Sequence, residues 1–220
     1  MTASRWLFAL LAPAALLACD DESGIALDFD PVATTAAPLT ALTLGTFEVT
    51  RLEALVTEVK LLPDKDPAKE ADNAKFKAKG DFWVDVLSPE DSIIPPIPLP
   101  ADTYKKVEFK FDKPKSGAGL DGTDAVIALD ATHDGQAIEL RLGATQKVTL
   151  RDVSGLALAE GGTSTFLVQL DIPGWFAGVD LDALEVDDDG VIRIDDKTNK
   201  AAHDTIAANV VAAIKLARKP

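Results

Sequence analysis

Apolar and charged side chains alternate along several short stretches of this chain, and the clearest example is residues 106–112. Every second residue is apolar, at Val107, Phe109 and Phe111, and charged residues occupy the positions between them. Successive side chains of a β-strand point to opposite faces of a sheet. This stretch therefore predicts a strand of an antiparallel sheet with one buried face and one wet face.

Other stretches rich in apolar and β-branched residues follow one another along the chain, with turn residues between them. We expect strands at about 25–29, 42–50, 52–62, 82–86, 125–129, 137–142, 147–151 and 163–172. Residues 63–80 read as a polar loop. Residues 88–100 hold five prolines, so we expect an irregular segment there. Short strands at this spacing are typical of a β-sandwich or barrel.

The apolar spacing becomes helical near the C-terminus and predicts one helix at about 199–216, with Asn199 or Thr198 as its N-cap. The expected fold class is therefore mainly β: an antiparallel β-sandwich of Greek-key or prealbumin-like topology with one C-terminal α-helix. Its length fits a single domain over residues 25–220. The helix prediction rests on the apolar positions Ala202, Ile206, Val210, Ala213 and Ala217.

The N-terminal region has the parts of a secretory signal peptide. Arg5 is the only charge before Cys19, and an apolar run too short to span a bilayer follows it. The end of this run, Leu16-Leu17-Ala18-Cys19, resembles the lipobox of bacterial lipoproteins. That resemblance implies a signal peptide at residues 1–18, lipidation at Cys19 and a tether at 19–24. The alternative is an ordinary signal peptide followed by a chance cysteine.

Three later segments carry a second resemblance. They are residues 54–61 (Ala-Leu-Val-Thr-Glu-Val-Lys-Leu), 83–87 (Trp-Val-Asp-Val-Leu) and 99–107 (Leu-Pro-Ala-Asp-Thr-Tyr-Lys-Lys-Val). Their order resembles an uncharacterised group of bacterial lipoprotein domains with a transthyretin-like or prealbumin-like β-sandwich. Asp102 departs from this pattern, because such domains show a glycine there. The group has no established activity, so the resemblance implies fold and location only.

The charge and cysteine content restrict the partners. The formal net charge is -14, and loss of Arg5 with the signal peptide would make it -15. Such an excess works against binding nucleic acid or anionic lipid headgroups through a basic surface. Cys19 is the only cysteine, so no internal disulfide can form. We expect membrane attachment through an N-terminal lipid, no nucleic-acid partner, and a protein or glycan ligand that the sequence does not identify.

Residues 185–196 resemble a twelve-residue calcium loop. Acidic residues occupy positions one, three, five and twelve, and Gly190 occupies position six. Oxygen ligands at alternate positions are what calcium requires, so Glu185, Asp187, Asp189 and Asp196 are the candidate ligands, with Ca²⁺ as the one candidate cofactor. The alternative is an Asp-Gly hairpin turn between extended segments at 184–186 and 191–194.

No serine lies in a nucleophile signature, and His133 and His203 are the only histidines. A catalytic triad assembles in space, so an envelope hydrolase stays an alternative. Four aromatic residues could form a sugar-stacking or partner-binding platform, but core packing or plugging the end of the sandwich is the simpler role: Trp83, Tyr104, Trp175 and Phe176. The sequence favours a non-enzymatic, lipid-anchored cell-envelope protein, periplasmic or on the outer surface, with a binding or structural role. A calcium-stabilised carbohydrate-binding or protein-binding module is the other alternative.

Overall fold

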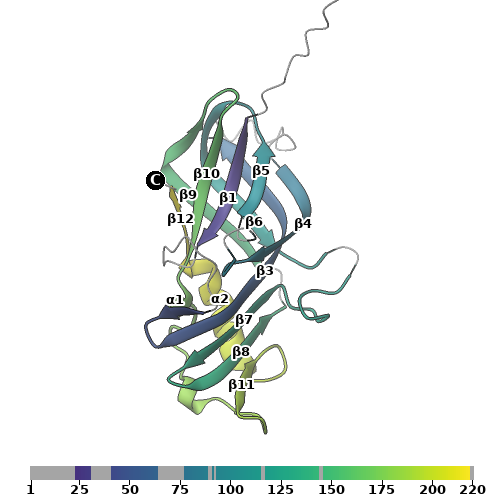
Figure 1. Cartoon of the computed structure of the whole chain (residues 1–220), viewed down its shortest axis with the longest axis vertical. Coiled ribbons are helices and arrows are strands. Elements are labelled where there is room, and N and C mark those ends of the chain that lie inside the picture. The colour runs from purple at the N-terminus through teal and green to yellow at the C-terminus, as the bar shows by residue number, and fades with distance from the viewer. Residues whose placement is uncertain are drawn as a thin grey trace, which may run out of the picture.

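The computed structural model describes residues 23–30, 41–63, 77–88, 91, 93–114, 117–143 and 146–218 (Figure 1). In this part of the chain most residues lie in the strands of two sheets, and the helix α2 (Lys200–Ala213) packs beside them. The expected fold class, a mainly β sandwich with a C-terminal helix, is confirmed. Residues 1–18 and Cys19 lie outside the described residues.

The first sheet has the strand order β12-β10-β1-β5. β1 (Gly24–Asp30) lies between β10 (Thr163–Leu170), to which it runs parallel, and β5 (Ile93–Pro98), to which it runs antiparallel. β12 (Ile214–Arg218) pairs antiparallel with the outer side of β10. Ile25, Leu27 and Phe29 of β1 are buried, so the centre of this sheet contributes directly to the core.

The second sheet has the order β11-β8-β7-β3-β6-β9, and two further strands, β2 and β4, pair with β3. All pairs in this sheet are antiparallel except β11 with β8. Its strands are β2 (Leu42–Leu44), β3 (Phe47–Pro63), β4 (Lys77–Asp85), β6 (Asp102–Phe111), β7 (Ile127–His133), β8 (Gln136–Leu142), β9 (Gln146–Leu158) and β11 (Val191–Ile194).

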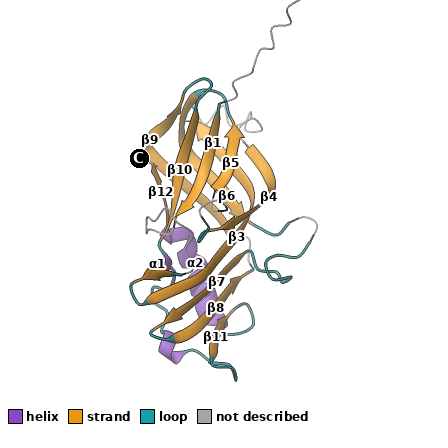
Figure 2. Ribbon diagram, in the orientation of Figure 1, coloured by secondary structure: helices purple, strands orange, loops and turns teal. Residues whose placement is uncertain are grey.

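β3 joins two halves of the molecule because its 17 residues pair with different strands along their length. Its first half pairs with β7, and its second half pairs with β4 and β6. The first sheet covers the second half, as Figure 2 shows. The rings of Phe29 and Phe109 meet across this sandwich at 5.6 Å in a T-shaped contact, a preferred geometry for aromatic pairs.

α2 covers the other half of the second sheet and lies behind β7, β8 and β11 in Figure 2. Ile206 and Val210 of this helix are fully buried and belong to the same core as Leu140 and Ile192 of the sheet. Two short helical segments, α1 (Ile172–Trp175) and η2 (Leu181–Ala183), lie between β10 and β11. One hydrophobic core therefore runs through both halves.

The two strands expected at 42–50 and 52–62 are wrong. The structure has the short β2, a turn at Gly45, and then the single long strand β3. Gly45 has a φ of +64°, which favours glycine, so the chain reverses there. Arg51, which separates the two expected strands, lies at a register shift between β3 and β7, and β3 continues through it. A bulge accommodates the extra residue without ending the strand.

The segment expected to be irregular, 88–100, contains β5, and the loop expected at 63–80 gives way to β4 at Lys77. β5 is an edge strand of the first sheet, where a missing N–H is tolerated. Ile94 and Ile97 are buried and lie opposite β1 residues, while Pro95 and Pro96 are exposed beside a register shift. The prolines therefore lie in an edge strand of the first sheet and do not prevent strand formation.

The C-terminal helix is shorter than expected, because α2 ends at Ala213 and Ile214 begins β12. Residues 214–218 instead supply an edge strand to β10, which satisfies backbone groups that a longer helix would leave exposed on that sheet. Asn199 occupies the expected N-cap position, but its side chain makes no capping bond and its φ is +51°. Most other expected strands are found within a few residues of their predicted positions.

Candidate functional site

The acidic turn that sequence singled out precedes β11. The amide of Asp187 donates to the carbonyl of Val191 at 3.0 Å, and the amide of Gly190 donates back to the carbonyl of Asp187 at 2.9 Å. Gly190 has a φ of +80°, so the bend uses the conformational freedom of glycine. The turn thus presents the carboxylates of Asp187 and Asp189 toward β11.

Arg193 of β11 holds both of these carboxylates. Its Nη1 donates to Asp187 Oδ2, and its Nη2 donates to Asp189 Oδ2 at 2.6 Å. Its Nε donates to Glu139 Oε2 of the neighbouring strand β8 at 3.3 Å. The hydrogen bond from Arg193 is the main cause that holds the pKa of Asp189 below its ordinary value. A guanidinium therefore lies among the carboxylates predicted to surround calcium.

The other two predicted ligands lie apart from this cluster. The Glu185 backbone exchanges hydrogen bonds with the Asn199 side chain, at 2.9 Å in each direction. Asp196 lies just after β11, which ends at Ile194. Among the described residues, no group of three or more acidic, histidine or cysteine side chains is arranged to hold a metal ion. Calcium binding at this turn stays a prediction, and it would require Arg193 to release Asp187 and Asp189.

The alternative hairpin is not formed as expected. Residues 184–186 are not in a strand, and β11 pairs in parallel with β8, so that Arg193 lies opposite Glu139. The Asn199 side chain links the carbonyls of Glu185 and Arg193, at 2.9 Å and 2.8 Å. The turn is therefore held by contacts with β8 and with the start of α2, and not by strand pairing between the segments 184–186 and 191–194.

A second ion-pair cluster, which the sequence did not reveal, surrounds Asp121. Arg51 donates from Nη1 and Nη2 to the two oxygens of Asp121 at 3.0 Å and 2.8 Å. Arg141 donates from Nε to Asp121 at 3.0 Å and from Nη1 to Asp130 at 2.6 Å. Hydrogen bonding from Arg51 holds the pKa of Asp121 below its usual range. These bonds fasten the turn containing Asp121 to β3 and β8.

Both clusters belong to one charged row across the sheet. In register, Arg193 lies opposite Glu139, Glu139 opposite Asp130, and Asp130 opposite Arg51, on four successive strands. Residues opposite one another in a sheet lie on the same face. We use "outer face" for this side of the second sheet, which is turned away from α2 and from the first sheet. In the half of the sheet covered by α2, the arginines of the outer face pair with neighbouring carboxylates.

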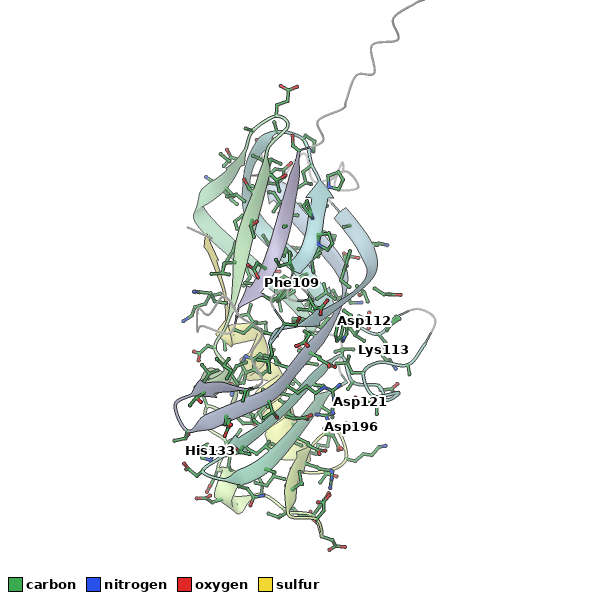
Figure 3. The ribbon with its side chains drawn as sticks, viewed as in Figure 1. Phe109, Asp112, Lys113, Asp121, His133 and Asp196 are labelled. Atoms are coloured by element: carbon green, nitrogen blue, oxygen red, sulfur yellow. The ribbon has the colours of Figure 1, made fainter. Side chains whose placement is uncertain are left out.

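The two histidines lie on different elements. His133 is half-buried at the end of β7, its ring 4.7 Å from that of Phe47, and Figure 3 shows it on the opposite side of the view from Asp121. His203 is buried on α2, with Nδ1 3.0 Å from Asp204 Oδ1. Among the hydrogen bonds of the described residues, neither histidine meets a serine hydroxyl, so these contacts do not assemble the envisaged triad.

The aromatic residues weighed as a platform are not gathered. Trp175, Phe176 and Tyr104 are buried, and Tyr104 donates its hydroxyl to the carbonyl of Pro100 at 2.8 Å. Trp83 of β4 is 47% exposed, so the expectation that it packs in the core is wrong. Its position in an alternating strand predicted the strand correctly but did not reveal which face was covered.

Comparison with known proteins gives no assignment: no protein family, curated protein or solved structure matches this chain. None of the helices in the described part of the chain is long and apolar enough to cross a membrane.

Proposed function

We propose that this chain is a lipid-anchored cell-envelope protein with a non-enzymatic binding or structural role. The observation that carries the proposal is the sequence Leu16-Leu17-Ala18-Cys19 at the end of an apolar run. Lipid attached to Cys19 would hold the sandwich at a membrane, in the periplasm or on the outer surface. Two or more acyl chains give stable anchoring, whereas one chain alone gives marginal binding.

The arrangement of charged groups supports binding over catalysis. The arginines on the outer face of the α2-covered half make their hydrogen bonds to neighbouring carboxylates. A serine nucleophile is commonly activated by a base within hydrogen-bond reach, and among the described residues the hydrogen bonds and ion pairs of His133 and His203 reach aspartates and no serine hydroxyl. A broad, solvated sheet face suits contact with a partner.

The anchor is tested by replacing Cys19 with serine. We expect the Cys19→Ser chain to leave the membrane fraction or to accumulate unprocessed, because serine has no thiol to accept the lipid. The measurement is fractionation of cells grown with a labelled fatty acid, followed by mass spectrometry of the N-terminal peptide. The wild-type chain should carry the label on Cys19, which is its only cysteine.

The matched control is Asp20→Asn, which changes the adjacent residue and keeps the cysteine. This variant should be lipidated like the wild type. If the Cys19→Ser chain fractionates and migrates like the wild type, the anchor proposal is wrong and the cysteine follows an ordinary signal peptide by chance.

A further inference from the structure

Lysines gather on the outer face of the other half of the second sheet. Lys77 lies opposite Lys60, and Lys60 lies opposite Glu108. In the adjacent row, Lys79, Glu58, Lys110 and Lys147 occupy opposed positions on β4, β3, β6 and β9. We name the following set the lysine face: Lys60, Lys77, Lys79, Lys106, Lys110 and Lys147, with Glu58, Asp81, Glu108 and Asp112.

The lysine face carries a net positive charge, opposite in sign to the net charge of the whole chain. Its six lysines outnumber its four carboxylates, while the chain as a whole carries a formal net charge of -14. The excess of acidic residues therefore lies outside the lysine face, and the net charge of the whole chain does not describe this surface. At physiological ionic strength the Debye length is about 8 Å, so a partner touching this face is largely screened from more distant acidic groups.

The glutamates hold the lysines on the sheet. Glu108 is 8% exposed, and the ammonium groups of Lys106 and Lys147 lie 2.6 Å and 3.2 Å from its carboxylate. Burial raises the pKa of Glu108, but hydrogen bonds from these two lysines outweigh it, so the pKa is lowered. The carboxylate thus stays charged near neutral pH. The lysine side chains remain accessible, from 23% for Lys77 to 59% for Lys147.

An exposed tryptophan lies on the same side of the sheet. Trp83 is opposite Leu55, and the next residue of β3, Val56, faces the core between the two sheets. Adjacent strand positions alternate, so Trp83 points to the outer face with the lysines. Tryptophan is enriched where an apolar and an aqueous phase meet, because its ring is apolar and its N–H is polar.

The lysine face lies on the half of the molecule that contains the start of β1. β1 begins at Gly24 in the sandwich half, and the carbonyl of Ser23 accepts from the amide of Leu99 beside the start of β6 (Figure 1). Cys19 precedes Gly24 by five residues. Five residues span at most about 17 Å, so a lipid on Cys19 would keep this half close to the bilayer.

We propose that the lysine face lies against an anionic phospholipid surface when the chain is anchored. Its charges form a two-dimensional array across four strands, which matches a layer of headgroups better than one linear polyanion. Basic side chains at a membrane surface are attracted to anionic lipids, and Trp83 would sit at headgroup level. This inference rests on the proposed anchoring at Cys19 and specifies the orientation of the anchored protein.

The test uses the full chain isolated from membranes and reconstituted into vesicles of phosphatidylcholine, with or without phosphatidylglycerol. Amine acetylation followed by mass spectrometry reports the accessibility of each lysine. We expect Lys79, Lys110 and Lys147 to react several-fold more slowly on phosphatidylglycerol vesicles. Lys200 and Lys215, which are exposed elsewhere, should react equally on both. Salt at about 1 M, where the Debye length is about 3 Å, should abolish the protection.

Two variants of equal net charge supply the control. The triple change Lys79→Gln, Lys110→Gln, Lys147→Gln should remove the phosphatidylglycerol-dependent protection of Lys77. The matched change Lys197→Gln, Lys200→Gln, Lys215→Gln should leave that protection intact. Equal reactivity of the face lysines on both vesicle types overturns the proposal. So does protection by soluble polygalacturonate in place of vesicles, which would assign the face to an anionic glycan.

Vesicle flotation in the same samples separates this proposal from the anchor. A chain that fails to float with neutral vesicles contradicts anchoring. Its lysines can still be labelled with phosphatidylglycerol vesicles present, and unchanged reactivity there overturns the lysine face independently. If the chain floats with the vesicles but its lysines are not protected, the anchor proposal stands and the proposed orientation is wrong.

Discussion

Arg193 is the residue on which the acidic turn depends. Its guanidinium contacts Asp187, Asp189 and Glu139, from the turn and from β8. One positive charge among three carboxylates relieves their mutual repulsion, and the planar guanidinium can bond several oxygens at once. A divalent cation at this place would have to compete with a side chain that is covalently part of the site.

Replacement of Arg193 should therefore strengthen any response to calcium. With Arg193→Gln we expect millimolar calcium to raise the melting temperature more than in the wild type, because a ligand that binds only the folded state stabilises it. Extracellular calcium modules bind at about 0.1 to 1 mM, which sets the useful concentration range. Thermal melts with calcium and with a chelator make the measurement.

The control for this prediction is Asp187→Asn in the Arg193→Gln background, which should lose the calcium response. Magnesium should act less strongly, since it demands a tighter octahedral shell. If the Arg193→Gln protein melts at the same temperature with calcium and with chelator, the turn is not a calcium site.

At the scale of an element, β6 shows how one strand serves two environments. Phe109 is 1% exposed and its ring lies 5.3 Å from that of Phe111 and 5.6 Å from that of Phe29. Lys110 lies between these two phenylalanines in sequence but on the outer face, where its Nζ is 2.5 Å from Asp112. The strand thus places its apolar side chains in the sandwich and its charges on the lysine face.

Truncation at neighbouring positions of β6 should have very different costs. Phe109→Ala should lower the free energy of unfolding by about 3–5 kcal/mol, because it leaves a cavity between the sheets. Lys110→Ala should change it by less than about 0.5 kcal/mol, because exposed ion pairs contribute little. Denaturant unfolding of both variants makes the comparison. Similar losses for the two would show that the strand register is wrong.

At the scale of the whole molecule, β3 couples the two halves. Its backbone pairs with β7 beside α2 and with β6 inside the sandwich, and the hydrophobic core is continuous through both. If one half of the molecule unfolded, half of β3 would lose its pairing partners. Buried apolar surface of the other half would also become exposed. Such sharing of one strand favours a single cooperative unit.

We therefore expect the two halves to unfold together. Amides of β1 in the sandwich and of β8 in the α2-covered half should exchange through the same global opening, with equal free energies and equal dependence on denaturant. Native-state hydrogen exchange read by mass spectrometry makes this measurement. Two separate opening energies, one for each half, would divide residues 25–220 into two folding units.

Local patterns determined the positions of most elements. The alternation around Phe109 and the helical spacing around Ile206 each predicted an element that the structure contains, because side-chain periodicity follows from backbone geometry over a few residues. Leu16-Leu17-Ala18-Cys19 likewise carries the anchor proposal by itself, although it lies outside the described residues. Periodicity did not find β5, since prolines mask a strand whose missing N–H groups are harmless only at an edge.

Only the tertiary structure decided which elements pair and which charges meet. The parallel pairing of β1 with β10 joins strands more than a hundred residues apart, and Arg51 reaches Asp121 across 70 residues. Register and strand order determine such contacts, and they depend on how the two sheets and α2 bury the core together. The same packing left Trp83 exposed and collected lysines from four strands on one face of an acidic protein.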